Sequence, residues 1–484
     1  MKLSALIDGW TGAGDPEIAG LTADSRAVKP GFLFAALPGA KADGRAFIAK
    51  AIEAGAAAVI APQGTAAAIP VVANDNPRRA FALAAARFYG RQPEIVAAIT
   101  GTNGKTSIAA FVRQIFAACG RKAASMGTVG IVSPSGERTL SHTTPDPVVV
   151  HQELARLADE GVTHLALEAS SHGLDQHRLD GVRIAAAAFT NLTRDHLDYH
   201  ATLEAYRDAK LRLFSEVVRD GGLAVVDADG EGAADFVAAA RARGLVLVTT
   251  GKAGETLKLT AREAHLDSQV LTVLHAGVGH VVRLPLAGSF QASNALVAAG
   301  IAIGLGENPF AVFAALSTLK GAKGRLDHVA TARSGAPIFV DYAHTPDALE
   351  TVLKTLRPHV QGRLHVVFGC GGDRDPGKRP LMGAAAARNA DVAIVTDDNP
   401  RSEIPALIRS EILAKAPGAV EIGDRAEAIR LAMREMQQGD LLVIAGKGHE
   451  TYQIVGDQTF PFDDAAVARQ AAAELGQEPM RAVQ

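Results

Sequence analysis

Cysteine is nearly absent from this sequence. Its 484 residues include only Cys119 and Cys370, which lie far apart in the chain and share no metal-ligand spacing. Two such thiols provide neither a disulfide framework nor a cysteine-based metal site. We therefore expect both to be small apolar residues of a protein in a reducing compartment.

An excess of charge of either sign is also lacking. Lys+Arg number 49 and Asp+Glu 52, which gives a formal net charge of −3, and no block of like charges forms a tail. A basic bias is the usual electrostatic signature of a nucleic-acid-binding protein, so nucleic acid is not an expected partner. Anionic ligands would have to be bound by local clusters of positive charge.

Long apolar runs are missing as well. The longest, residues 295–306, contains glycines and is too short to cross a bilayer. The N-terminal segment MKLSALIDGW is too short and too broken for a signal peptide. Hydrophobic residues make up 48% and charged residues 21%, which is typical of a globular protein. We expect a soluble, cytoplasmic protein with no membrane span.

The length predicts about three domains at roughly 150 residues each. Residues 1–88 alternate short apolar runs with turn-rich pieces, which is typical of a small α/β domain. Residues 89–323 alternate strands with helices and predict a mainly parallel sheet. Within them, residues 257–286 contain strands without helices and predict an antiparallel β insertion. Residues 324–484 predict another open α/β domain.

A glycine-rich loop, GTNGKT, begins at Gly101 between the predicted strand EIVAAIT and a predicted helix over residues 107–119. Backbone N–H groups at a helix N-terminus bind phosphate oxygens. A lysine such as Lys105 adds charge for the β- and γ-phosphates, and a threonine hydroxyl such as that of Thr106 can ligate Mg²⁺. The standard Walker spacing would need glycine where Ile99 stands. The context still predicts a nucleotide phosphate site.

Acidic and imidazole side chains follow two later strands of the same domain. Glu168 ends the strand THLALEA, and Asp195 and His196 follow the strand RIAAAAFTN. A carboxylate at a strand end beside a phosphate loop is well placed for Mg²⁺. A single histidine is more often structural than a ligand, so the residues alone leave the role of His196 open.

The third domain places polar segments at four strand ends: DYAHTPD, GCGGDRD, TDDNPR and AGKGHE. Ligands of open α/β sheets bind beyond the carboxyl ends of the strands. Arg374 and Arg401 could bind carboxylates through their forked guanidinium groups, and Glu450 could hold an ammonium group. Either arginine alone is more readily a solvated surface residue, but the four segments together favour an amino-acid site.

These segments resemble the Mur ligase family. The residues that carry the resemblance run from about position 20 to about 455, in the family's order: TADSRAVKPGFLFAALPGAKADGRAFI, GTNGKTS, LEASSHGLDQHRL, FTNLTRDHLDYH, KGAKGRLD, VDYAHTPDAL, GCGGDRDPGKRPLMG, DDNPR and AGKGHETYQ. The GTNGKT motif alone is shared by the whole superfamily, including folylpolyglutamate synthetases, and does not distinguish its members. The full set is most similar to ligases that add meso-diaminopimelate to UDP-N-acetylmuramoyl-L-alanyl-D-glutamate.

The resemblance implies three domains: a UDP-binding N-terminal domain, a central ATPase, and a Rossmann-like C-terminal domain that closes over the site. It implies UDP-substrate contacts at Ala23, Ser25, Ala40, Lys41, Ala42, Thr143, Thr144, Ser170, Gln176 and Arg178. It implies ATP contacts at Gly101, Thr102, Asn103, Gly104, Lys105, Thr106, Ser107, Asn294, Arg325 and Asp341. It implies diaminopimelate contacts at Arg374, Asp398, Asn399, Pro400, Arg401, Gly446 and Glu450. His142 departs from the asparagine that some relatives have before the Thr-Thr pair.

The resemblance also implies Mg²⁺ ligands at Thr106, Glu168, His196 and Lys210, and catalytic roles for Lys105, Lys210 and His196. Taken by itself, Lys210 would be a lysine on a helix surface; the resemblance implies that CO₂ carboxylates it to a carbamate. The implied reaction transfers the γ-phosphoryl group of ATP to a D-glutamate carboxylate, and an incoming amine then attacks the acyl phosphate. The expected partners are these small molecules, and the expected state is a monomer.

Two other functions are weighed against this one. Folylpolyglutamate synthesis is disfavoured by the UDP-site stretch around Ser25 and by the DNPR segment at residues 398–401. A regulatory nucleotide switch is disfavoured because no guanine-reading [NT]KxD motif follows the phosphate loop. A switch would also not need the polar segments of the third domain.

Overall fold

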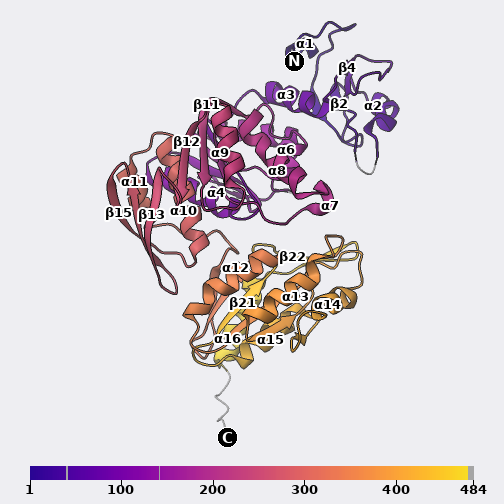
Figure 1. The fold of residues 1–484 in the computed structure, drawn as a ribbon. Helices are drawn as coiled ribbons and strands as arrows, with labels where there is room; N and C mark the ends of the chain where they lie inside the picture. The colour runs from indigo at the N-terminus through magenta and orange to yellow at the C-terminus, as the bar shows by residue number, and fades with distance from the viewer. Residues whose placement is uncertain (40–41, 141, 478–484) are drawn as a thin grey trace.

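The computed structural model describes residues 1–39, 42–140 and 142–477. Three separate sheets, one after another along the chain, form three α/β bodies (Figure 1). The α/β class and the three-domain fold agree with the sequence prediction. No helix within these described ranges has the length and apolar character that crossing a membrane requires.

The N-terminal domain is built on an all-parallel, four-stranded sheet in the order β1-β2-β3-β4. Its elements are α1 (Leu3–Leu6), β1 (Gly20–Thr22), β2 (Phe32–Ala35), η1 (Gly44–Phe47), α2 (Ile48–Glu53), β3 (Ala58–Ala61), β4 (Val71–Ala73) and α3 (Pro77–Tyr89). Helix α3 begins at proline, and the Asn76 side chain caps it by accepting a hydrogen bond from Arg79 N. Phe81 and Ala84 of this helix pack into the core of the domain.

The central domain contains an eleven-stranded sheet in the order β15-β14-β13-β12-β11-β10-β5-β9-β6-β7-β8. Strands β13 to β6 of this order pair in parallel, and antiparallel strands extend both edges. The strands of the predicted insertion at 257–286 pair antiparallel with one another, as expected, and β13 joins them to the central sheet through a parallel pairing with β12.

The elements of this domain, in chain order, are β5 (Ile95–Thr100), α4 (Lys105–Ala118), β6 (Ala123–Gly127), β7 (Gly130–Ser133), β8 (Gly136–Arg138), α5 (Pro147–Asp159), β9 (His164–Glu168), α6 (Ser171–Asp175), β10 (Ile184–Phe189), α7 (Leu197–His200), α8 (Leu203–Arg212), η2 (Leu213–Val217), β11 (Val218–Asp227), α9 (Ala233–Ala242), β12 (Val246–Gly251), β13 (Leu257–Ala264), β14 (Gln269–His275), β15 (Val278–Leu284), α10 (Ser289–Gly304) and α11 (Pro309–Leu316).

Both faces of the sheet are buried at the parallel strands in its middle, which explains why strands such as β5 and β10 are almost entirely apolar. Ala97 and Ile99 of β5 pack in a core with α4 and α10, whereas Val96 and Ala98 pack in a second core with α5 and α9. This alternation follows from the two-residue period of a strand. The helices thereby hold the carboxyl ends of β5, β9 and β10 rigidly at one edge.

The C-terminal domain has a six-stranded sheet in the order β16-β17-β21-β18-β19-β20, parallel except for the edge strand β16. Its elements are β16 (Asp327–Thr331), β17 (Pro337–Asp341), α12 (Pro346–Leu356), η3 (Arg357–His359), β18 (Leu364–Phe368), α13 (Lys378–Asn389), β19 (Val392–Val395), α14 (Pro405–Leu413), β20 (Val420–Glu421), α15 (Arg425–Glu435), β21 (Leu441–Ala445), β22 (Tyr452–Val455), β23 (Gln458–Pro461) and α16 (Asp464–Gln477). The hairpin of β22 and β23 stands apart from the sheet.

Candidate active site

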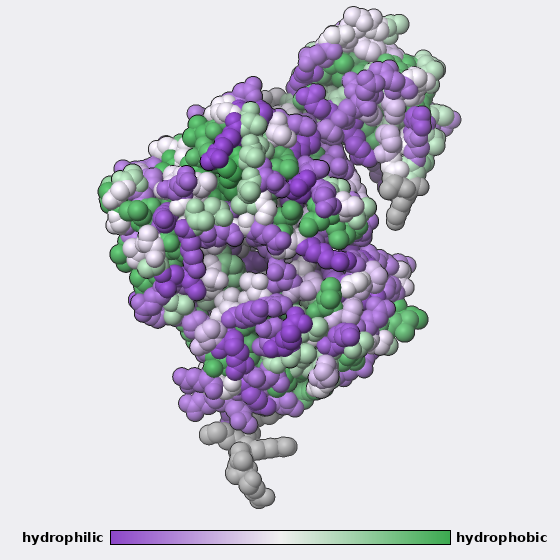
Figure 2. Space-filling view, in the orientation of Figure 1, coloured by the Kyte–Doolittle hydropathy of each residue, from purple (hydrophilic) through white to green (hydrophobic). Residues whose placement is uncertain are grey.

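A cleft of about 1490 Å³ separates the central and C-terminal domains. Figure 2 shows the molecule hollowed between these two bodies. Among the described residues that line the cleft, eight are lysine or arginine and eight are aspartate or glutamate. The cleft therefore has no overall field of one sign, and an anionic ligand has to be recognised by individual positive groups.

The glycines of the phosphate loop are required by close packing. Gly101 has φ +141° and Gly104 has φ +90°, both in the region that favours glycine. A Cβ atom at Gly101 would collide with the Thr190 hydroxyl, and one at Gly104 would collide with the Asn294 amide oxygen. The loop is also tied to Asn191, which accepts hydrogen bonds from Thr102 N (2.8 Å) and Asn103 N (3.0 Å). Helix α4 starts directly after it, at Lys105.

Lys105 folds back onto its own loop. Its Nζ donates to the carbonyl oxygens of Gly101 (2.9 Å) and Thr102 (2.8 Å). Burial lowers the pKa of Lys105, as does Arg325, whereas the carboxylates of Glu168 and Asp195 oppose the shift. A phosphate group in the loop would give this ammonium a charged acceptor in place of two carbonyls, and would thus stabilise its charged form.

Lys210 is buried, which corrects the interpretation of this residue as a surface lysine of a helix. It lies on α8 and is 1% exposed. Its Nζ donates to Gly101 O at 2.7 Å and lies 4.2 Å from the centre of the Tyr206 ring. Burial and the nearby charge of Lys105 lower the pKa of Lys210 well below its ordinary value, with Asp195 opposing. The sequence of α8 does not show that this face is covered by the phosphate loop.

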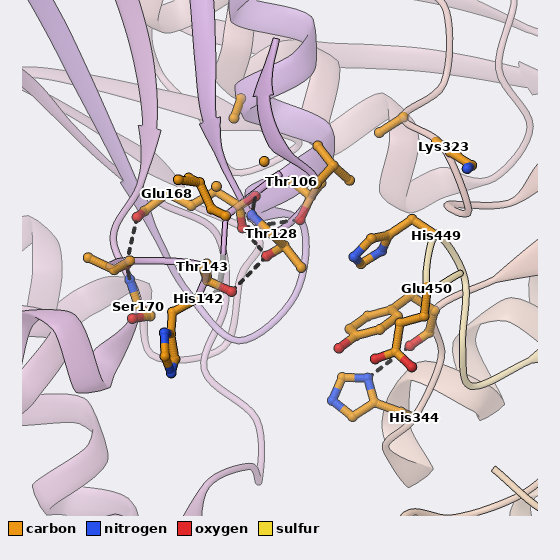
Figure 3. Close-up of a pocket in the computed structure, with 18 of the residues that line it drawn as sticks. Thr106, Thr128, His142, Thr143, Glu168, Ser170, Lys323, His344, His449 and Glu450 are labelled. Carbon is orange, nitrogen blue, oxygen red and sulfur yellow. Dashed lines mark hydrogen bonds between the residues drawn. The ribbon is translucent and has the colours of Figure 1, made fainter. Parts of the chain in front are cut away.

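Glu168 lies at the carboxyl end of β9, next to the loop, and is 1% exposed. Its Oε2 accepts hydrogen bonds from the hydroxyls of Thr106 (3.1 Å) and Thr128 (3.0 Å), and its Oε1 accepts one from Thr128 N (2.8 Å). Figure 3 shows these oxygens gathered on the central-domain wall of the cleft, opposite His449 and Glu450. Thr128 was not predicted from the sequence, because it belongs to none of the motifs.

Among the described residues, Thr106 and Glu168 are the only two of the four predicted Mg²⁺ ligands that are hydrogen-bonded to each other. His196 lines the same cleft but contacts Asp195, with Nε2 and Oδ2 3.4 Å apart. Its backbone is left-handed, with φ +53°. Lys210 donates to Gly101 O, the same oxygen that accepts a hydrogen bond from Lys105.

The residues predicted to bind the muramoyl peptide form one hydrogen-bonded group beside Glu168. The Thr143 hydroxyl is 2.9 Å from that of Thr128, and the Thr144 hydroxyl donates to Glu168 O at 2.9 Å. Ser170 N donates to the Thr144 hydroxyl at 3.1 Å.

Arg178 continues this group. Its Nη1 donates to Thr144 O (2.6 Å), and its Nη2 donates to the side-chain oxygen of Gln176 (2.7 Å). Thr143, Thr144, Ser170 and Arg178 line the cleft. The guanidinium group of Arg178 is thus held in place before any ligand is bound.

The predicted uridine contacts lie in the N-terminal domain, away from the lining of the cleft. Ala23 and Ser25 directly follow β1, at the carboxyl edge of the parallel sheet, which is where such sheets bind ligands. Ala40 and Lys41 lie outside the described residues, and Ala42 borders them.

The remaining predicted ATP contacts surround the junction between the two larger domains. Arg325 Nη2 donates to the Thr106 hydroxyl at 3.1 Å, and its guanidinium lies 4.4 Å from the centre of the Tyr342 ring. Asp341 accepts hydrogen bonds from Leu326 N (2.6 Å) and Ala343 N (2.8 Å), and burial raises its pKa to about 6. Asp341 therefore fixes the segment that carries Arg325.

The two arginines predicted to bind the amino acid both line the C-terminal wall of the cleft. Arg374 Nη1 donates to Asp373 O at 2.9 Å, and Arg401 Nη1 donates to Gly372 O at 2.8 Å. Asp373 and Arg401 have φ values of +53° and +52°. Non-glycine residues in this region are strained, and here the Ser402 hydroxyl bonds Asp373 Oδ1 at 2.6 Å and holds the two loops together.

The loop that carries Arg401 also carries Asp398 and Asn399, which are buried together with Lys447. The partly exposed Glu450 joins this cluster, and Gly446 directly precedes Lys447. Lys447 Nζ donates to Asn399 Oδ1 (3.0 Å), Glu450 Oε2 (3.2 Å) and Asp398 Oδ1 (3.4 Å). Lys447 was not predicted, although it lies within the AGKGHE segment. Pro400 is not part of the lining of the cleft; its backbone oxygen packs against Gly372.

Three family models match consecutive parts of the chain: the Mur ligase catalytic domain over residues 17–100, the Mur ligase middle domain over 99–302, and the glutamate ligase domain over 324–448. The chain belongs to the Mur ligase family. Among similar Mur ligases, one from Bradyrhizobium diazoefficiens is 56% identical, with 98% of this chain and 100% of the relative covered. Another, from Caulobacter vibrioides, is 57% identical over 95% of this chain and 96% of the relative. Both are named UDP-N-acetylmuramoyl-L-alanyl-D-glutamate--2,6-diaminopimelate ligase.

Solved structures share the architecture. A structure of UDP-N-acetylmuramoyl-L-alanyl-D-glutamate--2,6-diaminopimelate ligase is 34% identical, covers 99% of this chain and 100% of its own, and has a TM-score of 0.70. A folylpolyglutamate synthase from Mycobacterium tuberculosis, complexed with ADP and AMPPCP, matches 83% of this chain and 96% of its own with a TM-score of 0.64, but at 19% identity. The second match shows a common fold alone, so fold does not separate these two activities.

Proposed function

We propose that this Mur ligase uses ATP to join 2,6-diaminopimelate to UDP-N-acetylmuramoyl-L-alanyl-D-glutamate, in the synthesis of a peptidoglycan precursor. The observation that carries the proposal is the identity of 56–57% to ligases of that name over almost the whole chain. The cleft supports it, because the phosphate loop lies on one wall and two arginines lie on the other.

In the proposed reaction, a glutamate carboxylate oxygen attacks the γ-phosphorus of ATP, the bond to the bridging oxygen breaks, and ADP leaves. The amine of diaminopimelate then attacks the acyl carbon, loses a proton and displaces inorganic phosphate. Phosphoryl transfer depends mainly on positioning and charge neutralisation. Lys105 and Arg325 would supply positive charge at the phosphates, and Arg178 would position the muramoyl peptide.

Thr106 and Glu168 fit a magnesium ion, because they present hard oxygen donors next to the phosphate loop. Mg²⁺ held there would neutralise charge on the phosphate oxygens. His196 would supply a nitrogen ligand, and Mg²⁺ prefers oxygen ligands. We therefore propose that His196 is a weaker ligand of the ion than Thr106 and Glu168.

Lys210 fits carboxylation by CO₂. An amine must be unprotonated to attack CO₂, and the burial of Lys210 beside Lys105 favours the neutral form. The product, a carbamate, is an anionic oxygen group, and it would face Lys105 with a charge of opposite sign. We propose that this modified residue orients Lys105 and the metal ligands.

We further propose that the protein works as a monomer in the cytoplasm on small molecules alone. The proposed substrates are all small molecules, and the sequence has neither the cysteines of a disulfide framework nor a basic bias for nucleic acid.

The test is mass analysis of the products formed from ATP, UDP-muramoyl dipeptide and a panel of amino acids. We expect a product heavier by one diaminopimelate residue, with one ADP formed per product. A parallel reaction with a folate substrate and glutamate addresses the rival activity. Glutamylated folate without a UDP-linked product would overturn the proposal.

A further inference from the structure

Lys447 is a fully buried cation whose acceptors all belong to the proposed amino-acid site. It is 0% exposed, although it directly follows Gly446 at the end of β21. Its three donors are directed to Asp398, Asn399 and Glu450. A buried ammonium is tolerated only when it is paired and hydrogen-bonded, and here its partners are groups that line the cleft.

The hydrogen-bonded partners of Lys447 include two carboxylates. One lysine faces two carboxylates, those of Asp398 and Glu450. Arg425, which lies behind them, is already paired with Asp464 through two hydrogen bonds of 2.7 and 2.8 Å. Asp398 and Glu450 thus share one hydrogen-bonded ammonium, while the charges of Arg425 and Lys378 act on Asp398 without a hydrogen bond to it. A ligand ammonium at Glu450 would give this pair of carboxylates a second direct partner.

The hydrogen bonds also select one oxygen of Glu450. Lys447 Nζ and Asn399 Nδ2 both donate to Oε2, at 3.2 and 2.9 Å. This arrangement fixes the plane of the carboxylate and leaves Oε1 for a group in the cleft. Asn399 Oδ1 in turn accepts from Lys447 and from Ile454 N (3.0 Å), so the same lysine braces the loop that carries Arg401.

We infer that Lys447 is a positioning residue of the amino-acid site, which orients Glu450 toward the distal ammonium of the substrate and balances the charge of two neighbouring carboxylates. This inference rests on the proposed function. In this scheme, two groups of residues recognise the substrate. Arg374 and Arg401 bind its carboxylates, and the cluster around Lys447 binds its distal ammonium.

The ionisation of Glu450 should depend on Lys447. Burial and the Asp398 charge raise the pKa of Glu450, whereas Lys447 and the Asn399 hydrogen bond oppose the rise. Three further groups facing Glu450 are Tyr342, Tyr452 and Arg425. Without the lysine charge, the carboxyl would protonate at a higher pH and would lose its attraction for an ammonium.

The experiment compares steady-state kinetics of the wild type, Lys447→Met, Glu450→Gln and the double variant, with diaminopimelate as the varied substrate. We expect Lys447→Met to raise KM for diaminopimelate by on the order of tenfold to a hundredfold, the range for a charge-assisted hydrogen bond. The KM values for ATP and UDP-muramoyl dipeptide should change less than threefold, roughly. The acid limb of the kcat/KM profile should shift to higher pH.

The double variant keeps the test decisive even where Lys447→Met alone does not fold, because it removes one charge of each sign. If Lys447 acts through Glu450, the double variant and Glu450→Gln have the same KM for diaminopimelate. A further loss in the double variant, or an unshifted pH profile in a folded Lys447→Met, would overturn the inference. Lys354→Met, at an exposed ion pair on α12, is the matched control. Failure of the wild type to use diaminopimelate would instead contradict the proposed function.

Discussion

Lys210 and Lys447 are both almost completely buried, at 1% and 0% exposure, yet their surroundings are opposite. Lys447 has two carboxylates within hydrogen-bonding distance. Lys210 has a carbonyl oxygen, the face of a tyrosine and the neighbouring charge of Lys105. Burial disfavours the charged form of any lysine, so the partners determine which form persists. The carboxylates around Lys447 can pair with a positive charge, whereas the surroundings of Lys210 favour a neutral amine.

Two other buried groups show the same contrast. Arg425 resembles Lys447, because it is 2% exposed and is paired with Asp464. Asp227 resembles Lys210 with the signs reversed: burial raises its pKa to about 7, and the nearby Asp229 charge acts in the same direction. We expect the charged pairs to contribute to the stability of the fold. We expect the buried groups without an opposite charge to have a shifted pKa and, for Lys210, an altered reactivity.

The largest effect should come from removing the lysine that meets the phosphates. Lys105→Ala should reduce ligation by about a thousandfold or more, because a charge that stabilises the transition state is lost. Binding of UDP-muramoyl dipeptide, measured by calorimetry, should change little, since its predicted uridine site is in another domain. Ligation by this variant at a near wild-type rate would show that Lys105 is not at the phosphates.

Lys210→Ala should be the next most damaging change, with a loss of about a hundredfold or more when an anionic group beside the metal site disappears. Short carboxylic acids should restore part of the activity by occupying the space of the carbamate. Wild-type protein exchanged with ¹³C-bicarbonate should show a carbamate signal in NMR that Lys210→Met lacks and Lys447→Met retains. Full activity of Lys210→Ala in CO₂-depleted buffer would contradict the proposed modification.

Arg425→Met should destabilise the C-terminal domain by about 3–5 kcal/mol, because Asp464 is left as an uncompensated buried charge. Thermal and urea unfolding measure this loss. Arg388→Met removes an exposed ion pair with Glu350 and should change stability by about 1 kcal/mol or less. If the two variants lost the same free energy of unfolding, the buried pair would contribute no more to stability than the exposed one.

Asp227→Asn should have the smallest effect and should depend on pH. The unfolded chain releases the proton of Asp227 near pH 4, roughly the ordinary value, whereas the folded protein holds it until about pH 7. The stability that this group contributes is therefore complete below pH 4 and is lost as pH rises to about 7. The free energy of unfolding of the variant should equal that of the wild type at pH 4 and should be larger at pH 8 by on the order of 1–3 kcal/mol. If the difference in stability between Asp227→Asn and the wild type were the same at pH 4 and pH 8, the raised pKa of Asp227 would be excluded.

Much of the fold could be predicted from local patterns. The helix expected at 378–389 is α13 (Lys378–Asn389), and the strand expected as LHVVFG is β18 (Leu364–Phe368). Hydrophobic periodicity and turn residues suffice for such elements. The hairpin of β22 and β23 was missed, because its strands are largely exposed and show no buried face.

The place of a side chain in the cleft was predictable where it lies at a strand end within a motif, as for Glu168 and Arg401. It was not predictable where tertiary contacts decide burial. Nothing in the sequence of α8 distinguishes Lys210 from a solvated lysine, since the phosphate loop that covers it is more than a hundred residues away. Thr128 and Lys447 were missed for the same reason, because their importance lies in partners that are distant in the sequence.

Substrate choice is the most direct test of the account. With L-lysine, which lacks the distal carboxylate, Arg401 would remain unpaired in a closed site, at a cost of about 3–5 kcal/mol. The measurement is kcat/KM for meso-diaminopimelate and L-lysine in the wild type and in Arg401→Ala. We predict that the wild type favours diaminopimelate by about a hundredfold or more, and that the variant loses most of this preference by losing activity with diaminopimelate. Comparable efficiency of the wild type with the two amino acids would contradict the account.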